Sequence, residues 1–290
     1  MKTTYTYLPA IGRILSILIL LLASSITTVH AQQNPPPAKL AVYYGYPSLT
    51  NNIAAYANGA PRGDIAVAAA SLAQYDLLVI GDGLQDPCHP DHNNTKSIIG
   101  ILNNQNVAVY GYIDLGVSIQ NLTPITIQYR IEKWKEMGVT GIFLDDAGED
   151  FGVSEERMSN AIIWVHNADL SAFVNGFDPD FVFNTGEMKG QDWYMIESFH
   201  VRNGELYTTP KDQQYMEQKY QKCADYSKQY QTKIAALTTS TDERGYNQEL
   251  MNSAWQLAEK WNFHAFGWGE PNFSASGSSA NILPFRPRPE

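Results

Sequence analysis

Short apolar runs recur along this chain, and most of them are separated by segments that carry helix signals. Within each run nearly every residue is apolar, which is typical of parallel strands covered on both faces. Eight runs lie at residues 40–44, 77–80, 107–113, 142–144, 172–174, 194–196, 234–237 and 263–266. Residues 181–183 compete for the fifth place. The pattern predicts an α/β fold, a single-domain (β/α)8 TIM-type barrel, with a doubly wound open sheet as the alternative.

The segments between the runs begin and end as helices do. Thr123 is placed to cap a helix that has Pro124 at its first position and Gly138 at its end. Ser154 caps another, with two glutamates in its first turn. A last helix is marked by apolar residues at 250, 251, 254, 255 and 258.

The first 31 residues have the character of a secretory signal peptide. Lys2 and Arg13 precede an apolar core at 14–23, and Val29-His30-Ala31 offers a small-x-small cleavage site. A retained membrane anchor is the alternative, although the apolar run is short for a spanning helix. We expect a secreted protein with a proline-rich leader over 32–38 and the barrel over 39–290. Cleavage would leave 259 of the 290 residues, which suits one barrel.

The predicted mature chain is acidic. Without Lys2 and Arg13, 18 basic residues face 30 acidic ones. This balance disfavours binding to nucleic-acid phosphates. It would suit a cationic ligand such as a partly deacetylated amino-sugar polymer, and it also serves simple solubility.

The sequence raises two further questions, whether its two cysteines form a disulfide and whether a short histidine-containing stretch binds a metal. Cys88 and Cys223 could form a disulfide in an oxidising compartment, with two free thiols as the alternative. Asp86, His89 and His92 have metal-ligand chemistry at close spacing, but they lie in a proline-rich stretch that favours a surface turn. We therefore expect no metal site, and without a phosphate-binding glycine motif we expect no cofactor.

Two of the predicted strands end in acids that would share one face. Asp145 ends the fourth strand and Glu197 ends the sixth. In a parallel barrel the carboxyl ends of the strands converge on one pocket, where burial of one acid and hydrogen bonding of the other set their pKa values apart. Such a pair can cleave a glycosidic bond. The alternative is that these acids cap helices or pair with buried basic residues.

Further side chains at the same strand ends are candidates for substrate binding. Asp146 would orient Asp145 or bind a sugar hydroxyl or amine, whereas aromatic rings stack on sugar C–H faces. Asp114 and Asn175 would complete a polar ring, or else each is a turn residue that binds its own backbone. The supporting set is Asp146, Tyr44, Tyr112, Asp114, Asn175 and Trp268.

Three of these segments resemble one protein family. With Tyr44-Gly45-Tyr46-Pro47, the stretch from Gly141 to Asp146, and Ile196-Glu197-Ser198-Phe199, the chain resembles the spherulin-4-like proteins and the related endo-α-1,4-polygalactosaminidases. The resemblance implies a (β/α)8 barrel that acts on α-1,4-linked galactosamine or N-acetylgalactosamine polymers. It also implies a catalytic pair that maps to Asp145 and Glu197. The family often has Asp-Glu where this chain has Asp145-Asp146.

These features together predict a secreted retaining glycoside hydrolase that cleaves an amino-sugar polysaccharide. Asp145 is the expected nucleophile and Glu197 the general acid/base, with their carboxyl groups about 5–5.5 Å apart. A non-catalytic carbohydrate-binding barrel and a metal-dependent polysaccharide deacetylase are the alternatives. The expected partner is a polysaccharide, with no nucleic acid and no stable membrane insertion after signal cleavage.

Overall fold

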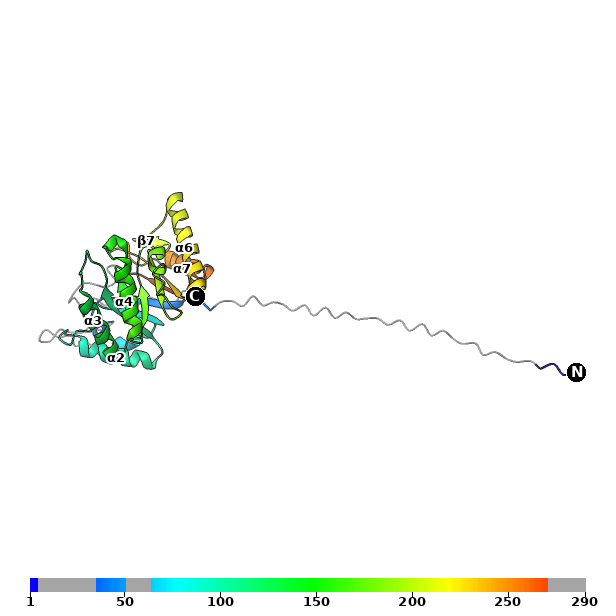
Figure 1. Ribbon diagram of the computed structural model, residues 1–290, viewed down its shortest axis with the longest axis horizontal. Helices are drawn as coiled ribbons and strands as arrows, with labels where there is room; N and C mark the ends of the chain where they lie inside the picture. Colours follow the sequence, from blue (N-terminus) through cyan, green and yellow to red (C-terminus); the bar gives the residue numbers. More distant parts are fainter. Residues whose placement is uncertain (5–34, 51–63, 271–290) are drawn as a thin grey trace. The chain divides into compact units, whose positions relative to one another are not determined.

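Eight parallel strands close into a barrel in the computed structural model, which describes residues 1–4, 35–50 and 64–270 (Figure 1). The strand order around the ring is β1-β10-β9-β6-β5-β4-β3-β2. The strands are β1 (Ala38–Tyr43), β2 (Leu77–Ile80), β3 (Ala108–Asp114), β4 (Gly141–Asp145), β5 (Ser171–Val174), β6 (Trp193–Glu197), β9 (Lys233–Thr238) and β10 (Ala265–Trp268). The predicted single-domain barrel is confirmed, and the open-sheet alternative is wrong because β1 pairs with both β2 and β10.

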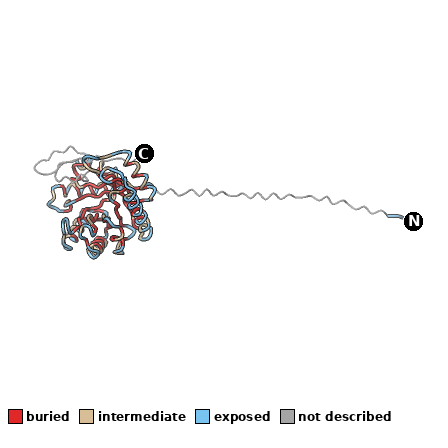
Figure 2. The backbone as a smooth tube through the Cα atoms, turned by 90° about the horizontal axis from the view of Figure 1, so that it is seen from above, coloured by how far each residue is buried: buried red, intermediate tan, exposed pale blue. Residues whose placement is uncertain are grey.

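Helices alternate with these strands. They are α1 (Ile65–Leu72), α2 (His92–Asn104), α3 (Pro124–Met137), α4 (Glu155–Asn167), α5 (Pro179–Phe183), α6 (Pro210–Tyr230) and α7 (Gln248–Lys260), with short 3-10 turns η1 (Pro47–Leu49) and η2 (Glu149–Phe151). After β6 the chain adds a small hairpin of β7 (Val201–Arg202) and β8 (Glu205–Leu206). In Figure 2 the strands are buried, while the helices expose one side. Among the described residues, no helix is long and apolar enough to cross a membrane.

Local sequence signals explain where the helices begin and end. The side chains of Thr123 and Ser154 accept hydrogen bonds from backbone N–H groups three residues on, as the sequence predicts. Gly138 ends α3 in the left-handed conformation, with φ +87°. The competing strand at residues 181–183 is instead helix α5, which Pro179 starts at its first position and Asp178 caps.

The period of two along each strand sorts side chains to the two faces of the barrel wall. On β4, Ile142 and Leu144 belong to the cluster shared with the helices, whereas Phe143 belongs to the cluster inside the barrel. The interior is rich in aromatic rings that contact one another, among them Tyr110, Phe173 and Trp193. The barrel is therefore a packed core that supports whatever lies at its open end.

The predicted disulfide is wrong: Cys88 and Cys223 are both free. Cys88 follows β2, and Cys223 is buried on α6, which follows β6. In the ring of eight strands, β2 and β6 lie opposite each other, with three strands between them on either side. The barrel thus keeps the two thiols apart.

Two parts of the predicted domain plan lie outside the described residues. They are the signal peptide beyond its first four residues and, within the predicted barrel, residues 51–63 and 271–290. Of the predicted leader only residues 35–38 are described, and Ala38 already belongs to β1. From Pro35 on, the chain forms one compact unit.

Candidate active site

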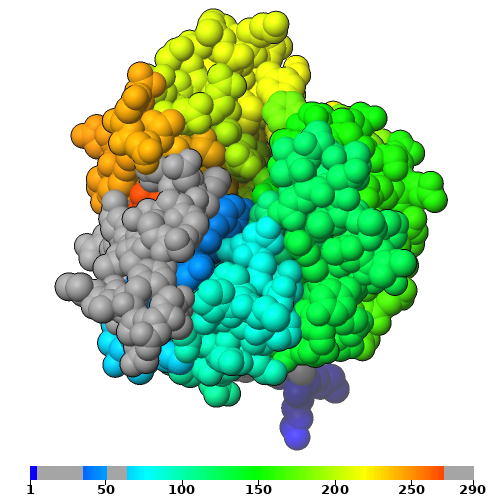
Figure 3. Space-filling view, turned by 90° about the vertical axis from the view of Figure 1, so that its left-hand side faces the viewer, coloured from blue at the N-terminus to red at the C-terminus, as the bar shows by residue number. Residues whose placement is uncertain are grey.

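The last inward-facing positions of three neighbouring strands carry polar side chains. Asp145 ends β4, Asn175 follows β5, and Glu197 ends β6. Each lies two residues after an aromatic or methionine side chain inside the barrel, at Phe143, Phe173 and Met195. The two acids that the sequence singles out therefore reach the same end of the barrel interior. Figure 3 shows a face on which segments distant in sequence meet: blue atoms of residues 35–50 lie beside cyan ones, with yellow-green ones above them.

Asn175 joins the two acids. Its Nδ2 donates one hydrogen bond to Asp145 Oδ1 and one to Glu197 Oε2, each with an N···O distance of 2.8 Å. An amide nitrogen has two hydrogens, so both are used. The two carboxylate oxygens can be no further apart than twice this distance, about 5.6 Å. This upper bound, which concerns one oxygen of each acid, is compatible with the separation of about 5–5.5 Å between the carboxyl groups of retaining glycosidases.

The chain turns sharply directly after each acid. Asp146 has φ +50° and Ser198 has φ +54°, both in the left-handed region that side chains other than glycine seldom adopt. Such a conformation costs on the order of 1–3 kcal/mol and is common at functional sites. Because the strand direction is broken there, Asp145 and Glu197 are the final residues that the barrel pattern directs inward.

Burial and negative neighbours raise the pKa of two acids at this site. Burial, together with the carboxylate of Asp146, raises the pKa of Asp145 to about 7, against the opposing effect of the hydrogen bond from Asn175. Burial also raises the pKa of Asp146 to about 6, with contributions from Asp114 and Glu197. A perturbed pair of this kind in a pocket is characteristic of functional sites. At neutral pH Asp145 is therefore only partly ionised.

Asp114 lies at the buried edge of this group. It is fully buried, its Oδ1 accepts a hydrogen bond from the backbone N–H of Gly116 at 2.7 Å, and burial raises its pKa. Its Oδ2 has no hydrogen-bond partner among the described residues. Asp114 thus binds its own turn, as one interpretation of the sequence held, and also adds negative charge beside Asp146.

Two tyrosines line the same end of the barrel. The hydroxyl of Tyr44 donates a long hydrogen bond of 3.4 Å to Asp145 Oδ2, and burial raises its pKa well above the ordinary value. Its ring contacts that of Tyr112 edge to face, with centroids 5.1 Å apart. Tyr112 is buried, with 8% of its surface exposed, so it serves mainly as the floor beneath the acids.

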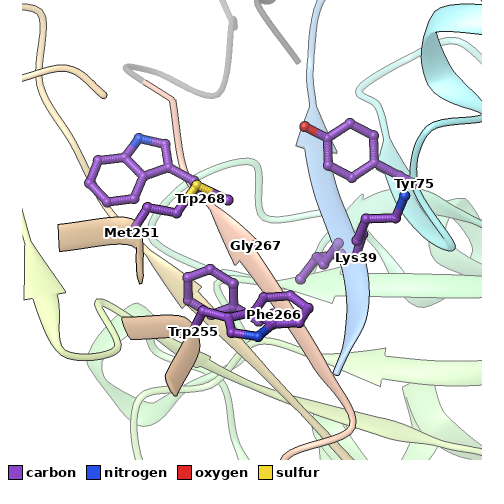
Figure 4. A pocket seen from close by; sticks show the side chains of 8 residues that line it. Lys39, Tyr75, Met251, Trp255, Phe266, Gly267 and Trp268 are labelled. Atoms are coloured by element: carbon purple, nitrogen blue, oxygen red, sulfur yellow. The ribbon is translucent and has the colours of Figure 1, made fainter. Parts of the chain in front are cut away.

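The structure does not bring Trp268 to the acids. Its position on β10 is outward, so it packs with the outer cluster and its ring lies 5.4 Å from that of Tyr246. Figure 4 shows its indole beside Met251, lining a small pocket between β1, β10 and α7. The inward position two residues after Ala265 is Gly267, which has no side chain, so Trp268 faces the outer side of the barrel wall and its role in substrate binding stays a prediction.

The histidine-rich loop after β2 is organised by its own backbone. Asp86 Oδ1 accepts a hydrogen bond from the N–H of Cys88, and His89 Nδ1 accepts one from the N–H of Asp91. His92 Nδ1 lies 2.9 Å from the carbonyl oxygen of Leu84. Among the residues the structure describes, no group of three His, Cys, Asp or Glu side chains could hold a metal ion. This loop therefore has the geometry of a turn.

Lys219 is a neighbour of the site that the sequence analysis missed. It is buried on α6, where burial lowers its pKa while Cys223 and Glu197 oppose this effect. Its Nζ donates a 2.6 Å hydrogen bond to the carbonyl oxygen of Phe177. A signal existed: Lys219 follows Met216 by three residues on the apolar face of the helix, where a charged residue needs a partner.

Comparisons with known proteins find likeness in structure alone. No protein-family model matches the chain, and no curated protein sequence does. The glycoside hydrolase domain of PelA from Pseudomonas aeruginosa has a TM-score of 0.52 at 12% identity, covering 86% of this chain and 100% of that domain.

Two further solved structures have similar TM-scores to this chain. For a GH18 chitinase from Pseudoalteromonas aurantia the TM-score is 0.52 at 11% identity, over 84% of this chain and 97% of that one. For an α-amylase from Geobacillus thermoleovorans it is 0.50 at 12% identity, over 86% and 75%. At such identities the likeness shows the fold, so this chain has the TIM-barrel fold found in these glycoside hydrolases.

Proposed function

We propose that the protein is a secreted glycoside hydrolase that cleaves an amino-sugar polysaccharide with retention of configuration. The observation that carries the proposal is the Asn175 amide, which holds Asp145 and Glu197 within about 5.6 Å of each other. That spacing favours direct attack by one carboxylate over the wider separation that an inverting mechanism needs for its water.

The proposed roles divide the two acids as follows. Asp145, at the end of β4, attacks the anomeric carbon and displaces the leaving sugar. Glu197, which is exposed, protonates the glycosidic oxygen as that bond breaks. In the second step Glu197 takes a proton from water, whose oxygen replaces Asp145 at the anomeric carbon. Tyr44 and Asn175, both bonded to Asp145, hold its carboxylate in place.

The charge of the site supports a cationic substrate. Burial raises the pKa values of Asp114, Asp145 and Asp146; Asp114 raises that of Asp146 further, and Asp146 that of Asp145. An ammonium group would relieve this repulsion. It would also lower the pKa of Asp145, so that the nucleophile ionises when such a sugar binds. The resemblance to spherulin-4-like proteins and endo-α-1,4-polygalactosaminidases supports the same substrate class, namely α-1,4-linked galactosamine polymers. The predicted signal peptide supports action outside the cell.

Incubation with a panel of galactosamine- and glucosamine-containing polymers tests this proposal. We expect new reducing ends from a galactosamine polymer, with the product first formed in the α configuration as seen by NMR. Glu197→Gln should abolish cleavage of the polymer and spare the first step on an aryl glycoside, whose leaving group needs no proton. A first product in the β configuration would overturn retention.

Two other outcomes would favour the alternatives. Polymer binding without any release of reducing ends would indicate a non-catalytic carbohydrate-binding barrel. Release of acetate that stops on addition of a chelator would indicate a metal-dependent deacetylase.

A further inference from the structure

We propose that Phe177 and Tyr215 form a carbohydrate-binding platform on the Glu197 side of the candidate site, where the leaving sugar would lie. The inference rests on the proposed function, since it assumes that a sugar chain passes the two acids. It adds a binding surface formed by residues outside the candidate site described above.

The two rings are exposed and lie together. Phe177 is 59% exposed and Tyr215 46%, although both are large aromatic residues. Their planes are nearly parallel, at 16°, with centroids 6.2 Å apart. At this separation the rings overlap little, so part of each face stays open. Single exposed aromatics are common on protein surfaces, but two exposed rings stacked on each other form a larger apolar surface.

Buried polar groups hold this surface in place from below. Lys219 is 6% exposed, and its Nζ lies 4.6 Å from the centroid of the Phe177 ring while donating to the Phe177 carbonyl oxygen. The hydroxyl of Tyr194 donates to the carbonyl oxygen of Gly176 at 2.7 Å. Because consecutive backbone carbonyls are bound by side chains from the barrel and α6, an exposed ring is fixed before any ligand arrives. Such preorganisation lowers the entropy lost on binding.

The platform lies on the side of the site formed by β5 and β6. Phe177 comes two residues after Asn175, the residue that bridges the acids, and Tyr215 lies on α6, which follows the strand carrying Glu197. Glu197 also acts electrostatically on Lys219, which lies beneath Phe177. In the proposed mechanism Glu197 protonates the departing oxygen, so a surface beside it receives the leaving part of the chain.

The chemistry of the platform selects a sugar ring as its ligand. A pyranose presents a face of C–H groups that packs on an aromatic ring, and the hydroxyl of Tyr215 supplies a polar edge. The competing interpretation is that the rings merely shield Lys219 from water. The two interpretations differ in whether loss of a ring affects a long substrate more than a short one.

Kinetics on two substrates separate these interpretations. Phe177→Ala, Tyr215→Ala and Phe177→Trp are compared with the unaltered protein on an α-1,4-linked galactosamine polymer and on an aryl α-galactosaminide, which is too short to reach the platform. Tyr129→Ala is the matched control, because Tyr129 is 53% exposed on the outer helix α3. We expect each alanine variant to lower the ratio of polymer to aryl kcat/KM by about 3- to 10-fold, a range that corresponds to the strength of one ring contact. Phe177→Trp should keep the ratio.

The other possible results distinguish failure of the platform from failure of the proposed function. An unchanged ratio in both alanine variants, or an equal loss on both substrates, would overturn the platform while leaving the hydrolase standing. If the unaltered protein cleaves neither substrate, the proposed function fails. In that event calorimetric binding of the same polymer decides on the platform: weaker binding by Phe177→Ala than by Tyr129→Ala supports it, and equal binding overturns it.

Discussion

Two aspartates at opposite ends of the barrel have contrasting surroundings. Asp192, which precedes β6, is fully buried and accepts hydrogen bonds from the N–H groups of Ala172 and Lys189 and from His166. Asp145, at the other end, shares one amide with Glu197, has one long bond from Tyr44, and lies beside another acid. The end that Asp192 occupies is built for stability.

The contrast shows what each end of the fold can do. Four close contacts to its two oxygens fix Asp192, so the cost of burying it is offset locally. Asp145 lacks such a set, and its pKa rises to about 7. In barrels of this class, chemistry belongs to the carboxyl ends of the strands and stability to the amino ends. Substitutions at each end of the barrel test this division.

Asp145→Asn should lower kcat on the polymer by at least about 10³-fold, because it removes the attacking carboxylate. Its melting temperature should stay level or rise, since the change removes negative charge from a crowded site. Steady-state kinetics and calorimetry measure the two quantities. A loss from Asp146→Asn greater than that from Asp145→Asn would place the nucleophile one residue later.

Asp192→Ala should destabilise the protein by about 3 kcal/mol without changing kcat, because two backbone N–H groups and His166 lose their partner. For a domain of this size that corresponds to a fall in melting temperature of about 6–12 °C. Glu205→Ala is the control, since Glu205 forms an exposed ion pair with Arg244 that is worth little. Equal melting temperatures for the two variants would refute the division.

The pH dependence of kcat/KM should show an acid limb near pH 7, since a nucleophilic Asp145 must be ionised and its pKa is about 7. The carboxylate of Asp146 raises that pKa, so Asp146→Asn should lower it and move the limb to lower pH. At pH 6 the variant should then retain a larger fraction of its maximal activity than the unaltered protein. A rate that instead falls as the pH rises through 7 would exchange the roles of Asp145 and Glu197.

Residues close together in the chain are enough to predict the barrel and the two acids at the ends of its strands. Continuous apolar runs can be covered on both faces only in a parallel sheet with helices around it, and the caps at Thr123 and Ser154 act through neighbours three residues away. The positions of Asp145 and Glu197 can be predicted in the same way, because each acid directly ends such a run. These features depend on residues close in the chain.

Which side chains from distant parts of the chain come into contact depends on the tertiary structure. The closed ring separates Cys88 from Cys223 by placing their strands opposite each other, and the inward-outward alternation turns Trp268 away from the site. The double hydrogen bond of Asn175, and the buried Lys219 beneath an exposed Phe177, likewise join residues from different βα units. Such contacts depend on how the strands close and on the register between them, and this geometry is set by packing across the whole barrel.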